Sequence, residues 1–386
     1  MLAVLAPGQG SQKPGFLTPW LDQPGVDARL RWWSALAGLD LGHLGTEADA
    51  EEIKDTARTQ PLLVAAALLA AEQLPMYDVA VVAGHSVGEL GAAALAGVLT
   101  PETAVTLAAI RGREMAAACA LEPTGMSAVL GGDPDEVVAA IDAAGLYPAN
   151  RNGAGQVVAA GAIPELEKFA ADPPAKAKVI KLAVAGAFHT PYMAPAERAL
   201  AAVAAGITAG APTKIVLSNR DGNAVDHGPT LLQRLVRQVT APVRWDLCMQ
   251  TLAEIGVTAV IELPPAGTLA GLAKRTLKGI EIITVNTPED LAKARDAIAR
   301  HGAAPSIEPT LQFRVVVAGA AGNFAPATEL VEGAEIRAGQ VIGHVVTRQG
   351  EVAAAAHEAG ILTEWLAHSD DPVAPGQPLA RIGEFA

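Results

Sequence analysis

The segment that most constrains the fold of this chain is the pentapeptide Gly84-His85-Ser86-Val87-Gly88. It follows an apolar run, residues 78–83, that predicts a strand, and it opens residues 88–95, which predict a helix. Gly-x-Ser-x-Gly at a strand-to-helix turn is typical of the nucleophile elbow, where flanking glycines prevent a clash at the sharp turn. The sequence therefore predicts an α/β fold with Ser86 as a candidate nucleophile. A purely structural glycine-rich turn is the alternative.

A serine nucleophile needs a general base, and histidine is the usual one. Of the eight histidines, His85 is the chain neighbour of Ser86, so we expect its side chain to diverge from the serine and to pack or line the pocket. His189 is the better candidate because it follows a predicted strand, residues 179–184, and catalytic groups collect at strand ends in α/β folds. The alternative is a buried or loop histidine without a catalytic role.

Arg111 lies in the middle of an otherwise apolar predicted helix, residues 100–119. Thr100 is expected to cap this helix, with Pro101 at its first position. An arginine on an apolar helix face needs an anionic partner. That partner is either Glu114, three residues further on, or a substrate carboxylate bound by the two prongs of the guanidinium. The pattern alone leaves both open.

Composition excludes several classes of protein. The net charge is −13 and aromatic residues make up 4 % of the 386 residues, which argues against nucleic-acid binding. Cys119 and Cys248 form neither a disulfide framework nor a zinc-ligand spacing, so we expect no metal. The N-terminus lacks the basic region of a signal peptide, and the longest apolar run, residues 61–71, is too short to span a bilayer. We therefore expect a cytoplasmic protein that does not bind membranes.

The order of predicted elements divides the chain into parts. Residues 125–187 predict strands and helices in the order β-α-β-β-α-β, a ferredoxin-like arrangement inserted into a larger α/β unit. After a linker at residues 301–309, residues 310–386 predict only short strands. There, Ala338-Gly339-Gln340-Val341-Ile342 is repeated as Pro375-Gly376-Gln377-Pro378-Leu379, which indicates a small, pseudo-symmetric all-β domain.

Residues 1–300 resemble the malonyl-CoA:acyl-carrier-protein transacylases of bacterial fatty acid and polyketide synthesis. The resemblance implies an α/β-hydrolase-like domain with an inserted ferredoxin-like subdomain. The motifs that carry it occur in the order of the family: Pro7-Gly8-Gln9-Gly10-Ser11-Gln12, Gln60-Pro61, Gly84-His85-Ser86-Val87-Gly88-Glu89, Arg111-Gly112-Arg113-Glu114-Met115, Asn152-Gly153, Gly186-Ala187-Phe188-His189, Pro242-Val243-Arg244-Trp245 and Gly271-Leu272.

The resemblance also implies a role for each site residue. Ser86 would be the nucleophile and His189 its base, oriented by the backbone carbonyl of Gln238 instead of a carboxylate. Arg111 would bind the free carboxylate of malonate. The backbone N–H groups of Gln9 and Val87 would form the oxyanion hole, and the acyl pocket would be lined by Met115, Phe188 and His85. In malonyl-selective members, a bulky ring at the position of Phe188 crowds an α-methyl group.

The implied reaction is malonyl transfer from malonyl-CoA to the phosphopantetheine thiol of acyl carrier protein, through a malonyl-serine intermediate. Two alternatives remain: a thioesterase that uses the same Ser86–His189 pair, and a non-catalytic docking subunit. The basic residues Lys274, Arg275 and Lys278 are candidates for binding the acidic carrier protein. One departure from the family lies at residues 262–267, where Glu-Leu-Pro-Pro-Ala-Gly replaces the usual Gly-Pro-Gly turn and puts the local turn in doubt.

Residues 308–386 resemble a biotinyl/lipoyl-type carrier domain. Such domains carry the cofactor on a lysine at the hairpin between their two halves, here residues 346–351. This hairpin has no lysine, and none follows Lys293. Because amide attachment needs a lysine amine, we expect neither biotin nor lipoate and no bound cofactor. The domain would then serve docking or dimerisation, or be an evolutionary remnant.

Overall fold

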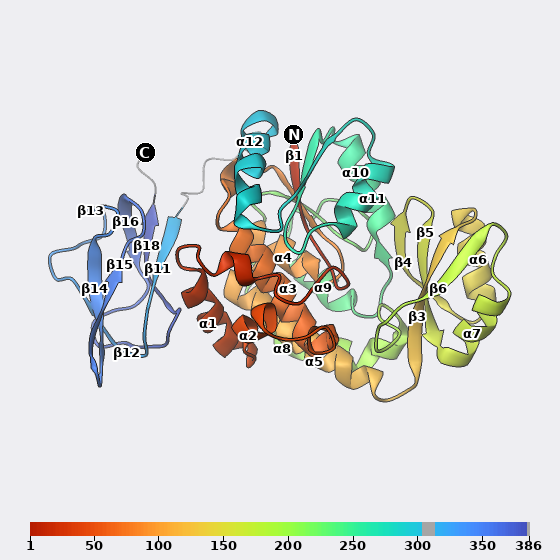
Figure 1. Ribbon diagram of the computed structural model, residues 1–386, viewed down its shortest axis with the longest axis horizontal. Coiled ribbons are helices and arrows are strands. Elements are labelled where there is room, and N and C mark those ends of the chain that lie inside the picture. The colour runs from red at the N-terminus through yellow and green to blue at the C-terminus, as the bar shows by residue number, and fades with distance from the viewer. Residues whose placement is uncertain (303–312, 384–386) are drawn as a thin grey trace. The chain divides into compact units, whose positions relative to one another are not determined.

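The computed structural model describes residues 1–302 and 313–383 (Figure 1). The chain divides into two compact units, which we treat separately: Met1–Phe16 with Leu44–Pro305, and Leu17–His43 with Ser306–Ala386. From residue 303 on, the expected linker lies outside the described residues. Within the described part of the chain, none of the helices has the length and apolar character that a membrane crossing requires.

The first unit is built around a five-stranded parallel sheet with the order β10-β9-β1-β2-β7. Side chains alternate between its faces: Ala3 and Leu5 of β1 pack in the cluster formed with α10 and α11, whereas Ala6 meets α4 on the opposite face. Coverage of both faces explains why the strands are continuous apolar runs. The strands are β1 (Leu2–Ala6), β2 (Val81–Gly84), β7 (Ile215–Leu217), β9 (Ala259–Glu262) and β10 (Glu281–Thr284).

Helices α3 and α5 supply long apolar surfaces to this unit. Helix α3 is buried along nearly its whole length, as its uninterrupted apolar sequence predicts. Thr100 caps α5 as predicted, since its hydroxyl accepts a hydrogen bond from the N–H of Thr103. The main helices of this unit are α3 (Thr56–Ala71), α4 (Gly88–Leu95), α5 (Pro101–Cys119), α8 (Ala194–Ala204), α9 (Gly228–Arg237), α10 (Trp245–Glu254), α11 (Thr268–Thr276) and α12 (Leu291–His301). Helix α1 (Val26–Ala37) belongs to the second unit, and α2 (Leu41–Thr46) is divided between the two.

The predicted β-α-β-β-α-β order is present between residues 124 and 181. Its strands form an antiparallel sheet of order β6-β3-β5-β4, which β8 (Val243–Arg244) extends by pairing parallel to β4. The elements are β3 (Thr124–Gly131), α6 (Pro134–Ala143), β4 (Tyr147–Gly153), β5 (Gln156–Ala162), α7 (Ile163–Ala171) and β6 (Ala177–Lys181).

Two predicted strands are displaced. The strand expected over residues 179–184 is β6, Ala177–Lys181, because its pairing with β3 ends at Ser127 and Lys181. The strand expected over residues 78–83 begins only at Val81, since Met76–Asp78 form a short 3-10 turn, and it extends to Gly84, which pairs with Ala6. Apolar composition does not show where pairing with a neighbouring strand starts or stops.

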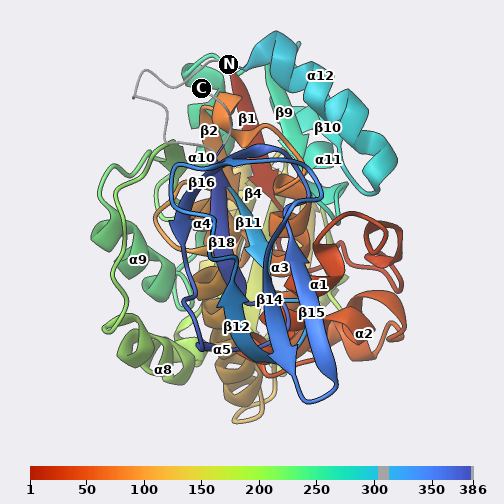
Figure 2. The same ribbon diagram turned by 90° about the vertical axis from the view of Figure 1, so that its left-hand side faces the viewer.

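The second unit contains two four-stranded antiparallel sheets, β11-β18-β16-β13 and β15-β14-β12-β17. Each strand of the first half, β11 to β14, has a counterpart four strands later at the equivalent place in the other sheet. Figure 2 shows β12, β14 and β15 side by side. The strands are β11 (Phe313–Val317), β12 (Gly322–Pro326), β13 (Glu335–Ile336), β14 (Val341–Thr347), β15 (Gly350–Ala355), β16 (Gly360–Trp365), β17 (Pro372–Val373) and β18 (Pro378–Gly383).

The sequence repeat forms the same turn twice. In the first copy, the side-chain oxygen of Gln340 accepts a 2.9 Å hydrogen bond from the N–H of Arg337. In the second, that of Gln377 accepts a 3.0 Å bond from the N–H of Ala374. Gly339 and Gly376 have φ angles of 79° and 82°, a region that favours glycine. The repeat thus reflects two copies of one strand–turn–strand unit.

Close packing of α4 on β1 predicts different responses at two glycines of this helix. A Cβ at Gly88 would lie 2.2 Å from the carbonyl oxygen of Ala6, whereas one at Gly91 would lie 3.6 Å from the Ala6 Cβ, an ordinary contact. We expect Gly88→Ala to lower the free energy of unfolding by about 1–3 kcal/mol. Gly91→Ala, the matched control, gains about 1 kcal/mol of helix propensity. Urea unfolding tests this, and equal stability of the two variants would contradict the packing argument.

Candidate active site

Ser86 stands at the turn between β2 and α4. Its φ angle of 53° lies in the left-handed region, which is strained for a residue with a side chain. The turn is tight because Gly84 and Gly88 touch: a Cβ at Gly84 would lie 2.1 Å from the carbonyl of Gly88. The N–H of Ser86 donates a 2.8 Å hydrogen bond to Oδ1 of Asn219, just beyond the end of β7. The geometry is that of the predicted elbow.

His189 contacts this serine from a segment far away in the sequence. Its Nε2 lies 2.7 Å from Oγ of Ser86, and its Nδ1 lies 2.7 Å from the carbonyl oxygen of Gln238. A carbonyl oxygen can only accept, so Nδ1 carries the hydrogen and Nε2 presents its lone pair to the serine hydroxyl. This is the arrangement a general base requires.

Electrostatics keep this imidazole neutral. Burial, and then the positive charge of Arg111, lower the pKa of His189 to about 3. At neutral pH the ring is therefore free to take a proton.

Arg111 projects from α5 into the same site, where it is 2 % exposed. Its guanidinium donates to Oε1 of Gln60 at 2.6 Å and to Oε1 of Gln238 at 3.0 Å, and one of its nitrogens lies 3.3 Å from Oγ of Ser86. Burial lowers its pKa to about 10, so it remains a cation at neutral pH. A cation this close to the nucleophile favours a substrate with a negative charge near the reacting carbon.

The alternative partner for Arg111 is wrong. Glu114 accepts a 3.0 Å hydrogen bond from Nε of Arg113, its neighbour in the chain. Helical spacing put Glu114 within reach of Arg111, but Arg111 points into the protein interior whereas Arg113 is at the surface.

The other predicted pocket residues surround these groups. His85 turns away from the serine, as expected: its Nε2 lies 2.9 Å from Oδ1 of Asn152 and its ring meets Trp245 edge-on. Met115 receives a 3.5 Å hydrogen bond from Nε2 of Gln60 at its sulfur. Phe188 is buried next to His189 in the chain.

The two predicted oxyanion donors flank the elbow. Val87 immediately precedes α4, so its N–H belongs to the unpaired first turn of a helix. The loop that carries Gln9 lies against the elbow, because a Cβ at Gly8 would be 2.7 Å from the carbonyl oxygen of His85. The side-chain nitrogen of Gln9 donates a 3.4 Å hydrogen bond to the carbonyl oxygen of Lys54.

Sequence reasoning missed three side chains of the site. Glu89 on α4 is 1 % exposed, and burial raises its pKa to about 7. Its carboxylate accepts hydrogen bonds from the Asn219 N–H at 3.0 Å and from the side-chain amide of Gln238. The argument that singled out Arg111, a charge within an apolar helix, applies equally to Glu89. Asn219 and the Gln238 side chain carry no comparable signal.

The unusual turn after β9 is well satisfied. The carboxylate of Glu262 accepts hydrogen bonds from the N–H groups of Gly267, Leu269 and Ala270 at 2.8, 2.9 and 2.7 Å, at the start of α11. The peptide bond between Pro264 and Pro265 is cis. The doubt about this turn is thereby resolved.

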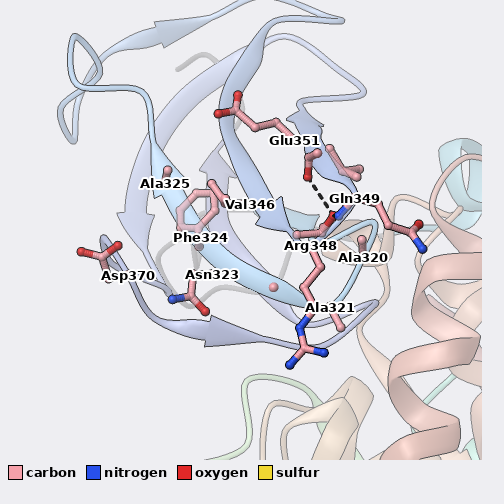
Figure 3. Close-up of a pocket in the computed structure, with 14 residues that line it drawn as sticks. Ala320, Ala321, Asn323, Phe324, Ala325, Val346, Arg348, Gln349, Glu351 and Asp370 are labelled. Carbon is pink, nitrogen blue, oxygen red and sulfur yellow. Dashed lines mark hydrogen bonds between the residues drawn. The ribbon is translucent and has the colours of Figure 1, made fainter.

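Two further features concern ligands. In the described residues, no three acidic, histidine or cysteine side chains form a group that could hold a metal ion. The second unit has an open groove of about 980 Å³ beside the turn between β14 and β15, lined by residues 320–325, 346–352 and 370 (Figure 3). None of the Ser86–His189–Arg111 group lines this groove.

The low pKa of His189 predicts the pH dependence of serine reactivity. The neutral imidazole is lost only as the pH falls through about 3, so labelling of Ser86 by a neutral fluorophosphonate should be constant between about pH 5 and about pH 8. In Arg111→Ala the repelling charge is gone, so the pKa of His189 should rise and the acid limb should move to higher pH. Labelling kinetics by mass spectrometry measure both. A wild-type midpoint near 6.5, the ordinary histidine value, would contradict the assignment.

Comparison with known proteins agrees with this geometry. The family model described as acyl transferase domain matches residues 5–299. The malonyl CoA-acyl carrier protein transacylase of Mycobacterium tuberculosis H37Rv is 57 % identical over 296 residues, which cover 75 % of this chain and 98 % of that protein. The protein of the same name from Escherichia coli K12 is 35 % identical over 302 residues, covering 76 % and 98 %.

Solved structures give the same result. The crystal structure of MCAT from Mycobacterium tuberculosis has a TM-score of 0.74 and 56 % identity, over 76 % of this chain and 99 % of that one. A malonyl-transacylase solved with a type II PKS acyl-carrier protein has a TM-score of 0.70 and 31 % identity, over 76 % and 99 %. Since the family model spans most of the chain and close relatives are covered almost end to end, the chain belongs to the acyl transferase family of the malonyl CoA-acyl carrier protein transacylases.

Proposed function

We propose that this protein transfers the malonyl group of malonyl-CoA to the phosphopantetheine thiol of acyl carrier protein. The observation that carries the proposal is the buried guanidinium of Arg111, 3.3 Å from the hydroxyl of a serine that is hydrogen-bonded to a neutral histidine. The pair provides acyl transfer, and the cation provides selection for an acyl group with a free carboxylate.

In the first half-reaction, Oγ of Ser86 attacks the thioester carbonyl while Nε2 of His189 takes the serine proton. The N–H groups of Gln9 and Val87 stabilise the negative charge that develops on the carbonyl oxygen. Collapse of the tetrahedral intermediate breaks the C–S bond, His189 returns the proton to the departing thiolate, and CoA leaves. The product is a malonyl ester of Ser86.

In the second half-reaction, the thiol of the carrier protein attacks this ester. His189 takes the thiol proton and passes it to Oγ of Ser86 as the ester bond breaks. The Gln238 carbonyl holds the imidazole through Nδ1 in both steps. It also stabilises the transient imidazolium, the task that a carboxylate performs in a Ser-His-Asp triad.

The acyl pocket follows from the same arrangement. Arg111 binds the distal carboxylate of malonate. Gln60 accepts a hydrogen bond from the guanidinium and donates one to the sulfur of Met115. Phe188 and His85 occupy the space around the acyl chain, where the ring of Phe188 would crowd an α-methyl branch.

A test of the proposal compares malonyl with neutral acyl groups. Incubation with malonyl-CoA alone should give a malonyl ester on Ser86 that persists for minutes and passes to carrier protein when this is added. Arg111→Ala should lose roughly a hundredfold of malonyl transfer, about 3 kcal/mol for a buried charge left without its partner, while acetyl transfer is kept or increased. Peptide mass spectrometry and transfer of radiolabel measure both.

The outcomes separate the candidate functions. Rapid release of malonate without carrier protein would identify a thioesterase, and no acylation at all would identify a non-catalytic docking subunit. Ser86→Ala provides the blank, since it should acquire no label. Unchanged rates of malonyl transfer in Arg111→Ala would contradict the proposal that Arg111 binds the malonyl carboxylate.

The carrier protein is acidic in this proposal and needs a basic surface for docking. Lys274, Arg275 and Lys278 are exposed at the C-terminal end of α11 and just beyond it. A related transacylase was solved in complex with its acyl-carrier protein, which supports such a partner here. The use of a CoA thioester and a carrier protein supports a cytoplasmic location for the proposed reaction.

We also infer that residues 1–300 form an α/β-hydrolase-like domain with a ferredoxin-like insert, and residues 310–386 a biotinyl/lipoyl-like domain. The two interlocked halves of the second unit support the latter. Their connecting hairpin carries Arg348 and Gln349 at its turn, where a carrier domain would have its lysine. The domain is therefore an unmodified relative of a carrier domain.

Intact mass tests this inference. After expression with biotin and lipoate and their ligases, the purified chain should have the mass of its unmodified sequence, because residues 294–386 contain no lysine. An added biotinyl or lipoyl group on the peptide that spans residues 346–351 would contradict it.

A further inference from the structure

We propose that Glu89 is a positioning residue that fixes the direction of a buried hydrogen-bond chain and thereby aims Arg111 at the acyl group. This inference rests on the proposed malonyl transfer. Glu89 lies on α4, three residues after Ser86, and its carboxylate accepts hydrogen bonds from Gln238 and Asn219.

The chain runs from one charged group to the other. Arg111 donates to Oε1 of Gln238 at 3.0 Å, and Nε2 of Gln238 donates to Oε2 of Glu89. All three side chains are buried, with exposures of 2 %, 6 % and 1 %. Buried polar groups must satisfy one another, because water is not available to replace a lost partner.

The two ends determine how the amide between them is oriented. A guanidinium only donates and an ionised carboxylate only accepts. The side-chain oxygen of Gln238 must therefore face Arg111 and its nitrogen must face Glu89. An isolated glutamine amide has no preferred direction, so the cation on one side and the carboxylate on the other together fix the orientation, and Glu89 supplies the acceptor that the amide nitrogen needs.

Asn219 links the same carboxylate to the elbow. Its N–H donates to Oε1 of Glu89 at 3.0 Å, its side-chain nitrogen donates to the carbonyl oxygen of Gly84 at 2.7 Å, and its Oδ1 accepts from the N–H of Ser86. The same Oδ1 receives a 3.2 Å bond from Nε2 of Gln238. If the Gln238 amide turned over, its nitrogen would face the donor Arg111 and its oxygen would face the acceptors Glu89 and Asn219.

The isosteric change Glu89→Gln affects the contact with Gln238 differently from the contact with Asn219. The new amide has one acceptor oxygen where the carboxylate has two, and we expect that oxygen to stay with the Asn219 N–H, because this donor belongs to the backbone and cannot turn away as the Gln238 side chain can. The elbow then keeps its support. The nitrogen of the new amide, however, meets the nitrogen of Gln238, donor against donor. If Gln238 turns over to relieve this clash, its nitrogen meets the guanidinium of Arg111 instead. The Gln238 side chain can relieve either clash only by moving, and this movement weakens its contact with Arg111, while the backbone contact of Gln238 with His189 remains.

We therefore expect a loss of acyl selectivity with little loss of serine reactivity. At pH 8, above the raised pKa of Glu89, the ratio of malonyl to acetyl transfer should fall at least about tenfold in Glu89→Gln. Labelling of Ser86 by a neutral fluorophosphonate should stay within about threefold of wild type. A role confined to folding would lower both rates together and leave the ratio unchanged.

Glu262→Gln is the matched control. Glu262 is a buried glutamate of the same unit whose carboxylate accepts backbone N–H groups at the start of α11. It should lower the unfolding temperature without changing the malonyl-to-acetyl ratio. If Glu89→Gln behaves like this control, the inference is overturned.

A crystal structure of Glu89→Gln tests the inference without any substrate. The expected result is separation of Arg111 from the Gln238 side chain with the Ser86–His189 contact intact. An unchanged Arg111–Gln238 contact would overturn the inference. Failure of the proposed function has a different signature, because wild-type protein would then show no preference for malonyl over acetyl groups.

Discussion

The site is organised around a positive charge that is held out of water beside a nucleophile. Arg111 is almost inaccessible to solvent, yet burial leaves it a cation at neutral pH. Such a charge is tolerated only where its donors are matched by acceptors. Gln60 and Gln238 supply these acceptors, and Gln238 in turn donates to the carboxylate of Glu89. Burial, and then the guanidinium, lowers the pKa of His189, so the buried cation also helps to keep the imidazole neutral.

Gln238 connects the parts of this arrangement. Its backbone carbonyl orients His189, and its side chain bridges Arg111 and Glu89. One residue at the end of α9 thus contacts both the imidazole of His189 and the guanidinium of Arg111. A structure with a carboxylate in place of this carbonyl would add a second negative charge next to Arg111. The neutral carbonyl orients the imidazole while it leaves the cation available to a substrate.

Much of this could be predicted from the sequence because the signals are local. The elbow follows from two glycines around Ser86, the cap of α5 from Thr100 and Pro101, and the pseudo-symmetry of the second unit from a repeated Gly-Gln turn. Strand limits were less accurate: β2 and β6 begin or end where a neighbouring strand stops pairing. The partner of Arg111 could not be chosen from helical spacing, which favoured Glu114 as much as a substrate.

The turn that exposes Ser86, the classes of the helices and strands, and the need of Arg111 for a partner all follow from the amino-acid sequence. Each depends on residues a few positions apart, whose backbone preferences act before any long-range contact forms. Which acceptors Arg111 receives and which way the Gln238 amide points depend on contacts between distant parts of the chain. The decisive hydrogen bonds join residues separated by 51, 127 and 149 positions. An amide can present either end to a neighbour, so its orientation exists only once a cation and a carboxylate are packed on opposite sides of it.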